Sequence, residues 1–381
     1  MPGSCHILYL TLFFSFKIGT MSKQGNSGTF SAMISSNLYK PLRGGIDNMG
    51  ETTIIDIHCH TAGMGAGGSG CFVSPALRRS WRYHFYLLAF GVTETELASR
   101  GDGLVVRRLS EALAASRRVA KAVVLALDGV VDANGELDEK HTEIFIPNSF
   151  VARETRLYPN LLFGASINPY RRDALGQLDK AAAAGAVLVK WLPPIQNIDP
   201  ADRRLVPFYR RLAALGLPLL SHTGEEFSFT RSRNELGDPE RLRLPLAEGV
   251  TVIAAHAASN GRNSGERNHD RFLRLAKSFP NLYADISALT QLNRLGHLER
   301  LLRHSELHDR LLFGTDMPLI NTGITSPWFH FYRLGQHELR SVLAEANPWD
   351  RDVALKEALG VTEEIFANGA RLLRDRPNGI S

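Results

Sequence analysis

The chain has 381 residues, of which 44% are hydrophobic and 22% are charged, with a formal net charge of +5. This composition is ample for one large hydrophobic core. Pairs of adjacent arginines, such as Arg78-Arg79 and Arg171-Arg172, are scattered along the chain, and 39 acidic residues offset their charge. We therefore expect no nucleic-acid partner. The three cysteines form neither a metal-binding pattern nor a disulfide framework, which favours a reducing, cytoplasmic setting.

The first 50 residues differ in character from the rest. Ile7 to Phe16 is apolar, but no basic residue precedes it, no small-residue cleavage site follows it soon, and it is too short to span a bilayer. Residues 17–50 are rich in Ser, Gly and Asn. We therefore predict a disordered, non-globular or misassigned extension over 1–50, one domain over 51–376, and no membrane partner.

The domain begins with an apolar, β-branched run that ends in His58-Cys59-His60. In a strand, side chains two apart point to the same face, so both imidazoles can reach one point. Imidazole is the commonest metal ligand in proteins, and a catalytic zinc normally takes three protein ligands. The pair therefore predicts half of a metal site, to be completed from elsewhere in the chain.

Four later apolar runs also end in a polar residue of the ligand type, namely Lys190, His222, His256 and Asp316. Three further runs, at 122–127, 161–167 and 282–286, lack such a ligand but complete a series of eight. Most of the runs are separated by stretches of helical character, such as 172–184 and 200–215. Strands alternating with helices predict an α/β fold, a (β/α)₈ TIM barrel with insertions.

In such a barrel the active site lies at the carboxyl ends of the strands, where all six candidate ligands are predicted. His58, His60 and His222 would supply neutral nitrogen ligands to a divalent metal. Asp316 would bind the metal and shuttle protons, and His256 would either ligate a second metal or polarise the substrate. A single histidine of this kind would be better explained as a hydrogen-bonded core residue. A set of such residues, each at the end of a predicted strand, is better explained as a metal site.

The ordered set resembles that of the amidohydrolase superfamily. The strings Thr53 to His60, Leu312 to Pro318 and Phe366 to Leu372 resemble the amidohydrolase-related branch, which includes aminocarboxymuconate-semialdehyde decarboxylase. The resemblance runs from about residue 50 to about residue 375 and implies one or two divalent metal ions, with zinc expected. In binuclear members the strand-4 lysine is carboxylated and bridges the metals, whereas mononuclear decarboxylases typically lack it, so Lys190 favours hydrolysis.

We therefore predict a metal-dependent hydrolase of a small amide, ester or lactone that bears a carboxylate. Two alternatives stay open: a metal-dependent, non-oxidative decarboxylase on the same scaffold, and a non-catalytic metal-binding barrel. Lys190 could equally be a plain cation that holds a substrate carboxylate or a nearby Asp. The sequence leaves the substrate, the metal count and a homo-oligomeric state undecided.

Several other residues are candidates for supporting roles. Arg171 or Arg172, just after the third strand, could bind an anionic substrate. Asp285 could accept a hydrogen bond from a ligand histidine, and Glu225 and Glu226 also lie near a strand end. The glycine-rich segment 61–70 predicts a loop over the metal that either approaches it closely or is mobile. The aromatic segment 80–86 predicts a cap, a subunit contact or a buried cluster.

Overall fold

The eight apolar runs form one parallel sheet in the computed structural model of the chain, which describes residues 53–375. Neighbouring strands in the sheet follow one another in the sequence, and every such pair is parallel. In order, the strands are β1 (Ile54–His60), β3 (Val119–Leu125), β5 (Leu161–Ala165), β6 (Leu188–Trp191), β7 (Leu219–Ser221), β8 (Val252–Ala254), β11 (Leu282–Asp285) and β12 (Leu311–Leu312).

The first strand also bonds to the chain that leaves the last strand. The Ile57 N–H donates to the Phe313 carbonyl at 3.2 Å, and the His60 N–H donates to the Met317 carbonyl at 3.0 Å. Cys59 and Met317 form a parallel bridge between these hydrogen bonds. The sheet therefore closes on itself, which confirms the predicted (β/α)₈ barrel.

The buried carboxylate of Asp56 stabilises this contact between the first strand and the chain that follows the last strand. It accepts hydrogen bonds from the His58 N–H at 3.0 Å, from the Thr315 N–H and hydroxyl at 3.0 and 2.6 Å, and from the Trp349 indole at 2.9 Å. Burial raises the pKa of Asp56 to about 6, against the effect of these donors. Asp56 thereby ties together the two segments that carry His58 and Asp316.

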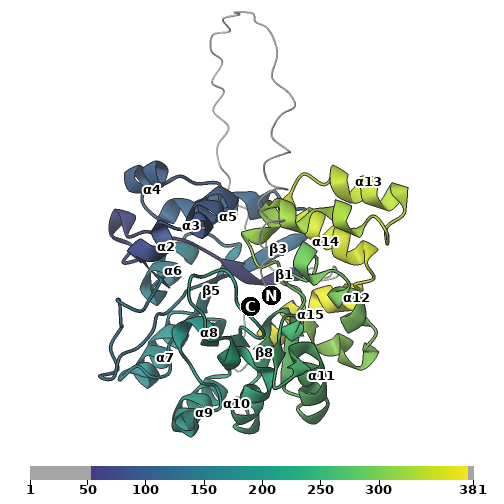
Figure 1. Ribbon diagram of the computed structural model, residues 1–381. Coiled ribbons are helices and arrows are strands. Elements are labelled where there is room, and N and C mark those ends of the chain that lie inside the picture. The colour runs from purple at the N-terminus through teal and green to yellow at the C-terminus, as the bar shows by residue number, and fades with distance from the viewer. Residues whose placement is uncertain (1–52, 376–381) are drawn as a thin grey trace, which may run out of the picture. The chain divides into compact units, whose positions relative to one another are not determined.

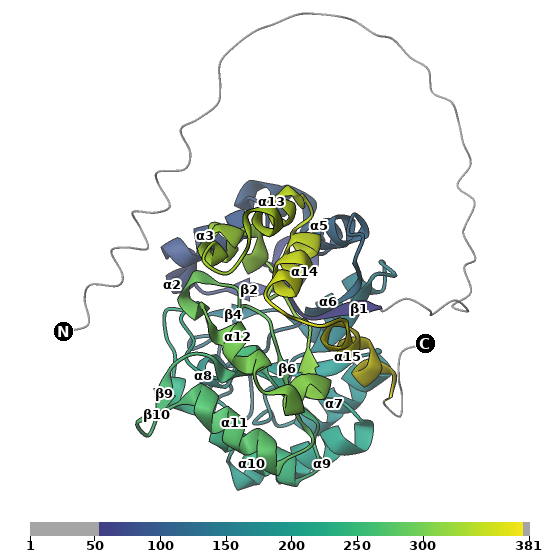
Figure 2. The same ribbon diagram turned by 90° about the vertical axis from the view of Figure 1, so that its right-hand side faces the viewer.

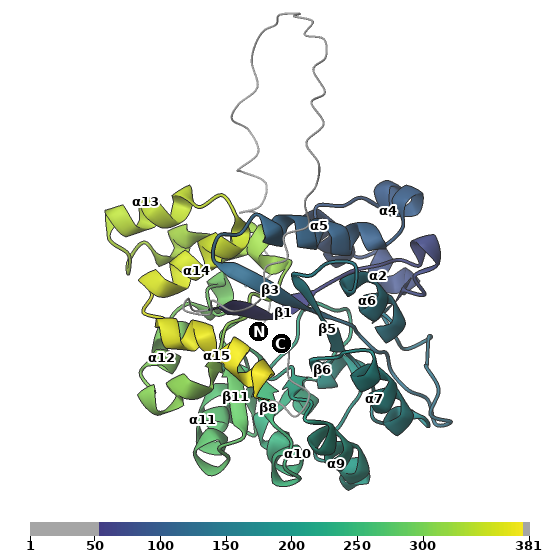
Figure 3. The ribbon, with the colours of Figure 1, turned by 180° about the vertical axis from the view of Figure 1, so that it is seen from behind.

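Helices surround the strands on the outside of the barrel (Figure 1). Those that cover it are α5 (Gly103–Ala114), α6 (Asn148–Thr155), α7 (Ala174–Ala183), α9 (Val206–Leu215), α10 (Arg243–Ala247), α11 (Asn268–Ser278), α12 (His297–Leu302) and α14 (Pro348–Ala358). The last helix, α15 (Glu363–Arg374), packs Ala370 and Leu373 against the residues of the barrel interior. The side view shows α11 and α12 next to each other on one flank (Figure 2), and the view from behind shows the strands enclosed by the helices (Figure 3).

The remaining elements lie in the loops. They are β2 (Phe72–Val73), α2 (Pro75–Arg78), α3 (Trp81–Ala89), α4 (Glu94–Arg100), β4 (Ile144–Phe145), α8 (Pro193–Gln196), β9 (Arg262–Asn263), β10 (Glu266–Arg267) and α13 (Gln336–Ala344). The longest insertion is residues 61–118, between β1 and β3, and its helices follow directly on the first predicted ligands.

The core has two parts because the strands are buried on both faces. A small cluster that includes Ile55, Val123, Leu220 and Ile253 fills the barrel interior, whereas the other side chains of the strands pack against the helices. Burial on both faces explains why the strands are continuous apolar runs rather than alternating ones.

Proline sets the start of one helix that the sequence predicted over 200–215. The helix α9 begins at Val206 with Pro207 at its second position, and residues 203–205 form a separate 3₁₀ turn. A proline is accommodated in the first turn because that position needs no backbone N–H. The helix ends at Leu215, as predicted, and is followed by Gly216, whose φ of 61° is left-handed.

Among residues 53–375, no helix combines the length and the apolar character that crossing a membrane requires. The prediction of a disordered extension over residues 1–50 lies outside the described residues.

Candidate active site

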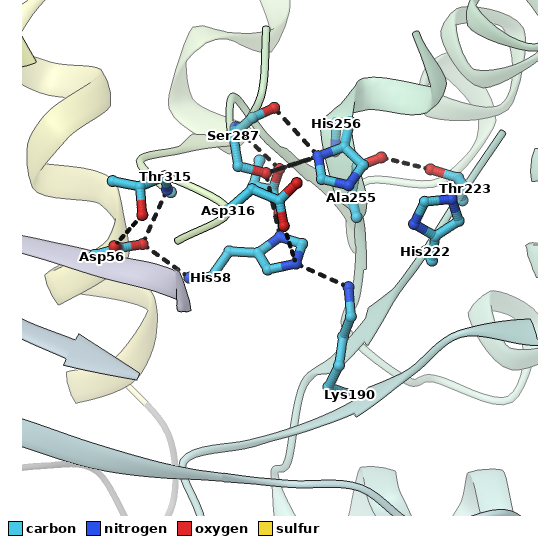
Figure 4. A network of polar contacts seen from close by, with 12 residues as sticks. Asp56, His58, Lys190, His222, Thr223, Ala255, His256, Ser287, Thr315 and Asp316 are labelled. Atoms are coloured by element: carbon cyan, nitrogen blue, oxygen red, sulfur yellow. Dashed lines mark hydrogen bonds and ion pairs between the residues drawn. The ribbon is translucent and has the colours of Figure 1, made fainter. Parts of the chain in front are cut away.

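The six predicted ligands lie together at one mouth of the barrel, and all of them line one cavity. They come from five strands or strand ends: His58 and His60 from β1, Lys190 from β6, His222 after β7, His256 after β8 and Asp316 after β12. Figure 4 shows Lys190 rising from its strand towards the ring of His58, with Asp316 and His256 on the other side of that ring. The convergence follows from the fold, because parallel strands bring their carboxyl ends to the same edge.

The contacts between these groups are short. The Nε2 atom of His58 lies 3.2 Å from Nε2 of His60, 3.1 Å from Nζ of Lys190 and 3.6 Å from Oδ1 of Asp316. Oδ1 of Asp316 lies 3.2 Å from Nε2 of His60. The ring of His256 stacks 5.1 Å from that of His58. These nitrogen and oxygen atoms therefore surround one small volume.

Three of the histidines are held by an oxygen on the side away from that volume. Nδ1 of His58 lies 2.8 Å from Asp285, Nδ1 of His256 lies 2.8 Å from the Ser287 hydroxyl, and Nδ1 of His222 lies 3.5 Å from Glu226. A metal-bound histidine usually donates its other ring N–H in this way. Each Nδ1 is thus occupied, and each Nε2 is left for the cavity side.

Asp285, which the sequence predicted as a partner of a ligand histidine, is the centre of this support. Its Oδ2 lies 2.8 Å from Nδ1 of His58, and its Oδ1 accepts from the Ser287 hydroxyl at 2.5 Å and from the backbone N–H of His256 at 2.8 Å. Sequence reasoning missed Ser287. The available signal was its position two residues after Asp285, which places both side chains on one face of an extended segment.

The donor set fits a metal ion. Within the described residues, Nε2 of His222 is buried and has no hydrogen-bond partner. Ligand atoms of His58, His60 and Asp316 lie within 4.8 Å of one another, as do those of His58, His256 and Asp285. Neutral imidazoles together with a carboxylate are typical zinc ligands, and a buried nitrogen without a partner is a site that an ion would satisfy.

Burial and neighbouring charges set the protonation states. Burial lowers the pKa of His58 and His256 and lowers that of His222 to about 4, so these rings are neutral and able to ligate. Burial by itself raises the pKa of Asp316, but His256, His60 and His58 outweigh it and hold the pKa well below its usual range. Burial lowers the pKa of Lys190 to about 8.

The backbone is strained at two of the predicted ligands. His256 and Asp316 have left-handed φ values of 57° and 60°, a conformation that costs a residue with a side chain about 1–2 kcal/mol. The neighbouring Gly314 is required for close packing, because a Cβ there would lie 3.0 Å from Cβ of His58 and 3.2 Å from Cβ of Ser287. Such strain is concentrated at functional sites in proteins.

The cavity in front of the ligands has a volume of about 190 Å³. Its outer wall is mostly apolar and comes from the 61–118 insertion and the loop after β7, with Val73, Leu77, Tyr83, Tyr86, Leu87, Phe90, Leu97, Phe227 and Phe229 among its residues. The aromatic segment 80–86 therefore covers the site, since α3 contributes Tyr83 and Tyr86. Arg82 of α3 also donates to the Phe227 carbonyl at 3.1 Å, which joins the two parts of the wall.

The glycine-rich loop also forms part of this wall, through residues 61–64. It is fastened by the buried carboxylate of Asp102, which accepts from the Met64 and Gly65 N–H groups at 3.0 and 2.8 Å and from the Ser69 hydroxyl at 2.5 Å. Of the two forms that the sequence predicted for this loop, the structure shows the close approach to the site.

The suggestion that Arg171 or Arg172 binds the substrate was wrong. Neither residue lines the cavity. Arg171 pairs with the buried Asp128, and Arg172 pairs with Glu136 on the surface. A position just after a strand does not by itself predict that a side chain faces the cavity, because these two arginines form ion pairs with nearby carboxylates instead.

Comparison with solved structures gives one match at a TM-score of 0.50, which supports the fold, and others below that value. An uncharacterised TIM-barrel protein of Bordetella bronchiseptica is 18% identical with a TM-score of 0.50, and the match covers 81% of this chain and 99% of that one. The IDCase of Metarhizium anisopliae is 16% identical with a TM-score of 0.47, and the match covers 84% of this chain and 97% of that one. The 5-carboxyvanillate decarboxylase of Sphingomonas paucimobilis is 11% identical with a TM-score of 0.45, and the match covers 85% of this chain and 99% of that one. No curated protein matches the chain.

A family model described as amidohydrolase matches residues 55–347, which is most of the barrel and includes all six residues at the mouth. Members of this family are enzymes, hydrolases or decarboxylases, and typically use a divalent metal. The match and the barrel agree with the resemblance that the sequence motifs indicated. The chain belongs to the amidohydrolase family.

Proposed function

We propose that the chain is a metal-dependent hydrolase that cleaves an amide, ester or lactone bond in a small compound bearing a carboxylate. The observation that carries the metal site is the buried Nε2 of His222, which lacks a hydrogen-bond partner among the described residues and lines the same cavity as the other predicted ligands. Hydrolysis rather than decarboxylation is favoured by Lys190, whose Nζ lies 3.1 Å from Nε2 of His58. A buried polar atom without a partner costs about 1–3 kcal/mol, and a metal ion would remove that cost.

We expect zinc, as one or two ions. His58, His60, His222 and Asp316 would hold the first ion, and His256 with a carboxylated Lys190 would hold a second. When bound, the metal would polarise the carbonyl of the substrate and lower the pKa of a coordinated water. The low pKa of the Lys190 amine supports carboxylation, since that reaction requires a neutral amine.

Asp316 is the residue suited to move the proton. Its carboxylate is ionised and its side chain is 13% exposed at the cavity. It can accept a proton from the attacking water and deliver it to the leaving group. The same carboxylate orients His60, which lies 3.2 Å away.

The hydrogen bonds of His256 favour one of its two predicted roles. Its Nδ1 lies 3.2 Å from the carbonyl of Ser287, which can only accept, so Nδ1 carries the proton. In the neutral ring, Nε2 then has a lone pair and no proton. His256 is therefore suited to ligate a metal or to accept a proton, and not to polarise a carbonyl by donation.

The test is turnover of a panel of amides, esters and lactones in oxygen-18 water. Hydrolysis places the label on the cleaved carbonyl of the product. Release of carbon dioxide with a solvent hydron on product carbon would instead identify a decarboxylase and overturn the proposal.

Metal dependence is tested on the same panel. Stripping with a chelator, His58→Ala and Asp316→Asn should each abolish turnover and lower the zinc content while the helical circular dichroism is retained. His141→Ala is the matched control, because that histidine is exposed and lies outside the cavity. Full activity of the stripped protein would contradict a catalytic metal.

A further inference from the structure

The loop that follows β11 contributes two buried polar side chains to the cavity wall. Gln291 is 4% exposed and Arg294 is 7% exposed, and both line the cavity. They sit in one turn, in which the Arg294 N–H donates to the Gln291 carbonyl at 2.8 Å. The Gln291 amide nitrogen, Nε2, has no hydrogen-bond partner among the described residues. A buried donor of this kind indicates an acceptor that arrives with the ligand.

Arg294 is held in place from behind. With the side-chain amide of Asn260 in its better orientation, the amide oxygen accepts from Nε and Nη2 of Arg294 at 3.2 and 3.1 Å. The guanidinium lines the same cavity as the predicted ligands His222 and His256, and its charge adds to the effect of burial in lowering their pKa values. A guanidinium stays protonated and is not a metal ligand, so its place beside the ligand cluster needs another explanation.

The rest of the cavity narrows the class of ligand. Among the described residues that line it, the cationic side chains apart from the histidines are Lys190 and Arg294. Lys190 is directed at His58. Glu225 and Glu226 belong to the same wall, which disfavours a dianion such as a phosphate monoester. The outer wall is apolar and aromatic, so the body of the ligand should be apolar as well.

We propose that Arg294 and Gln291 form a carboxylate-binding subsite beside the metal ligands, and that the substrate carries one carboxylate on an apolar body. With Nε and Nη2 of Arg294 directed at Asn260, the Nη1 side of the guanidinium and the Gln291 amide N–H together offer donors to the two oxygens of a carboxylate. As an assignment of substrate class, the inference rests on the proposed function, but the subsite itself does not require turnover.

The test is binding of benzoate to the chelator-treated protein, measured by calorimetry, with benzamide as the neutral probe of the same shape. Arg294→Gln should weaken benzoate binding about tenfold, as expected for a lost charge-assisted hydrogen bond. Gln291→Leu should weaken it about threefold, and Arg294→Lys should fall between wild type and Arg294→Gln. Binding of benzamide should be unchanged.

The control is Arg303→Gln, which removes the same charge from an exposed position at the end of α12 and should leave benzoate binding unchanged. Circular dichroism of each variant shows whether it folds, and Arg294→Lys preserves the charge if Arg294→Gln does not fold. Three outcomes would overturn the subsite: no benzoate binding by the wild type, equal affinity in the Arg294 variants, or an equal loss of benzamide binding.

This result is independent of the hydrolase assay. A protein that binds benzoate through Arg294 but hydrolyses nothing would refute the proposed function and keep the subsite. Metal-dependent hydrolysis that is equally fast for acidic and neutral substrates in wild type and Arg294→Gln would keep the metal-dependent hydrolase, and would refute both the subsite and the carboxylate on the substrate.

Discussion

At the scale of single residues, the site is defined by which atom of each imidazole is already engaged. Asp285, Ser287 and Glu226 take up Nδ1 of three histidines. Because one nitrogen of each ring is occupied, the other is fixed in direction as well as in protonation state. These supporting residues therefore decide the geometry of the site as much as the predicted ligands do.

Lys190 gives a pH-dependent prediction for stability. Its pKa in the folded protein is about 8, below the usual 10.5, because of burial. A lysine with a depressed pKa contributes stability above its unfolded pKa, and this contribution is lost as the pH falls through about 8. Charged Lys190 is therefore destabilising at neutral pH, by about 3 kcal/mol for this shift.

We expect Lys190→Met to raise the free energy of unfolding of the metal-free protein at pH 7 by about 3 kcal/mol, and by less than about 1 kcal/mol at pH 10. Urea unfolding from pH 7 to pH 10 measures both values. Lys180→Met is the control, because Lys180 is exposed on α7. A loss of stability at pH 7 would show that the charged amine is stabilised by its neighbours.

At the scale of elements, the cavity depends on insertions that are fastened to the barrel by single buried groups. Asp102 immediately precedes α5 and binds the glycine-rich loop that supplies residues 61–64 of the wall. Three donors depend on this one carboxylate. The loop is thus held close to the site by a residue that has no contact with the cavity itself.

Asp102→Ala should lower the free energy of unfolding by about 3 kcal/mol, because it leaves buried donors without an acceptor. It should also speed hydrogen exchange across residues 61–70 and raise the KM of any substrate. Glu111→Ala, at an exposed position on α5, should change none of these. Unchanged exchange in the loop of Asp102→Ala would mean that other contacts hold it.

At the scale of the whole molecule, the described residues 53–375 contain all eight strands of the sheet and both hydrophobic clusters of the core. The Asp56 carboxylate, with its donors from three segments, links the first strand to the chain that follows the last strand and to α14. The same carboxylate therefore both closes the barrel and aligns His58 with Asp316.

We predict that a chain starting at Met49 folds and binds metal like the full chain, because residues 1–48 carry no core-forming pattern beyond one short apolar run. Its melting temperature and its zinc content after reconstitution should equal those of the full-length protein. Loss of soluble protein on this truncation would assign a structural role to the segment.

The sequence by itself determined the barrel and the set of six residues at its mouth. Eight apolar runs specify strands buried on both faces, and parallel strands have only one edge at which residues after each run can meet. His58 and His60 could be placed on one face from their spacing alone. Their roles as metal ligands remain predictions.

Only the tertiary structure decided which residues support the site and which residues line the cavity. Ser287 and Asp102 act through contacts between segments 31 and 38 residues apart, with His256 and Met64. Arg171 and Arg294 look alike as arginines near strand ends, yet one pairs with Asp128 and the other lines the cavity. Side-chain direction in loops depends on partners brought in by folding, and periodicity carries no information about those partners.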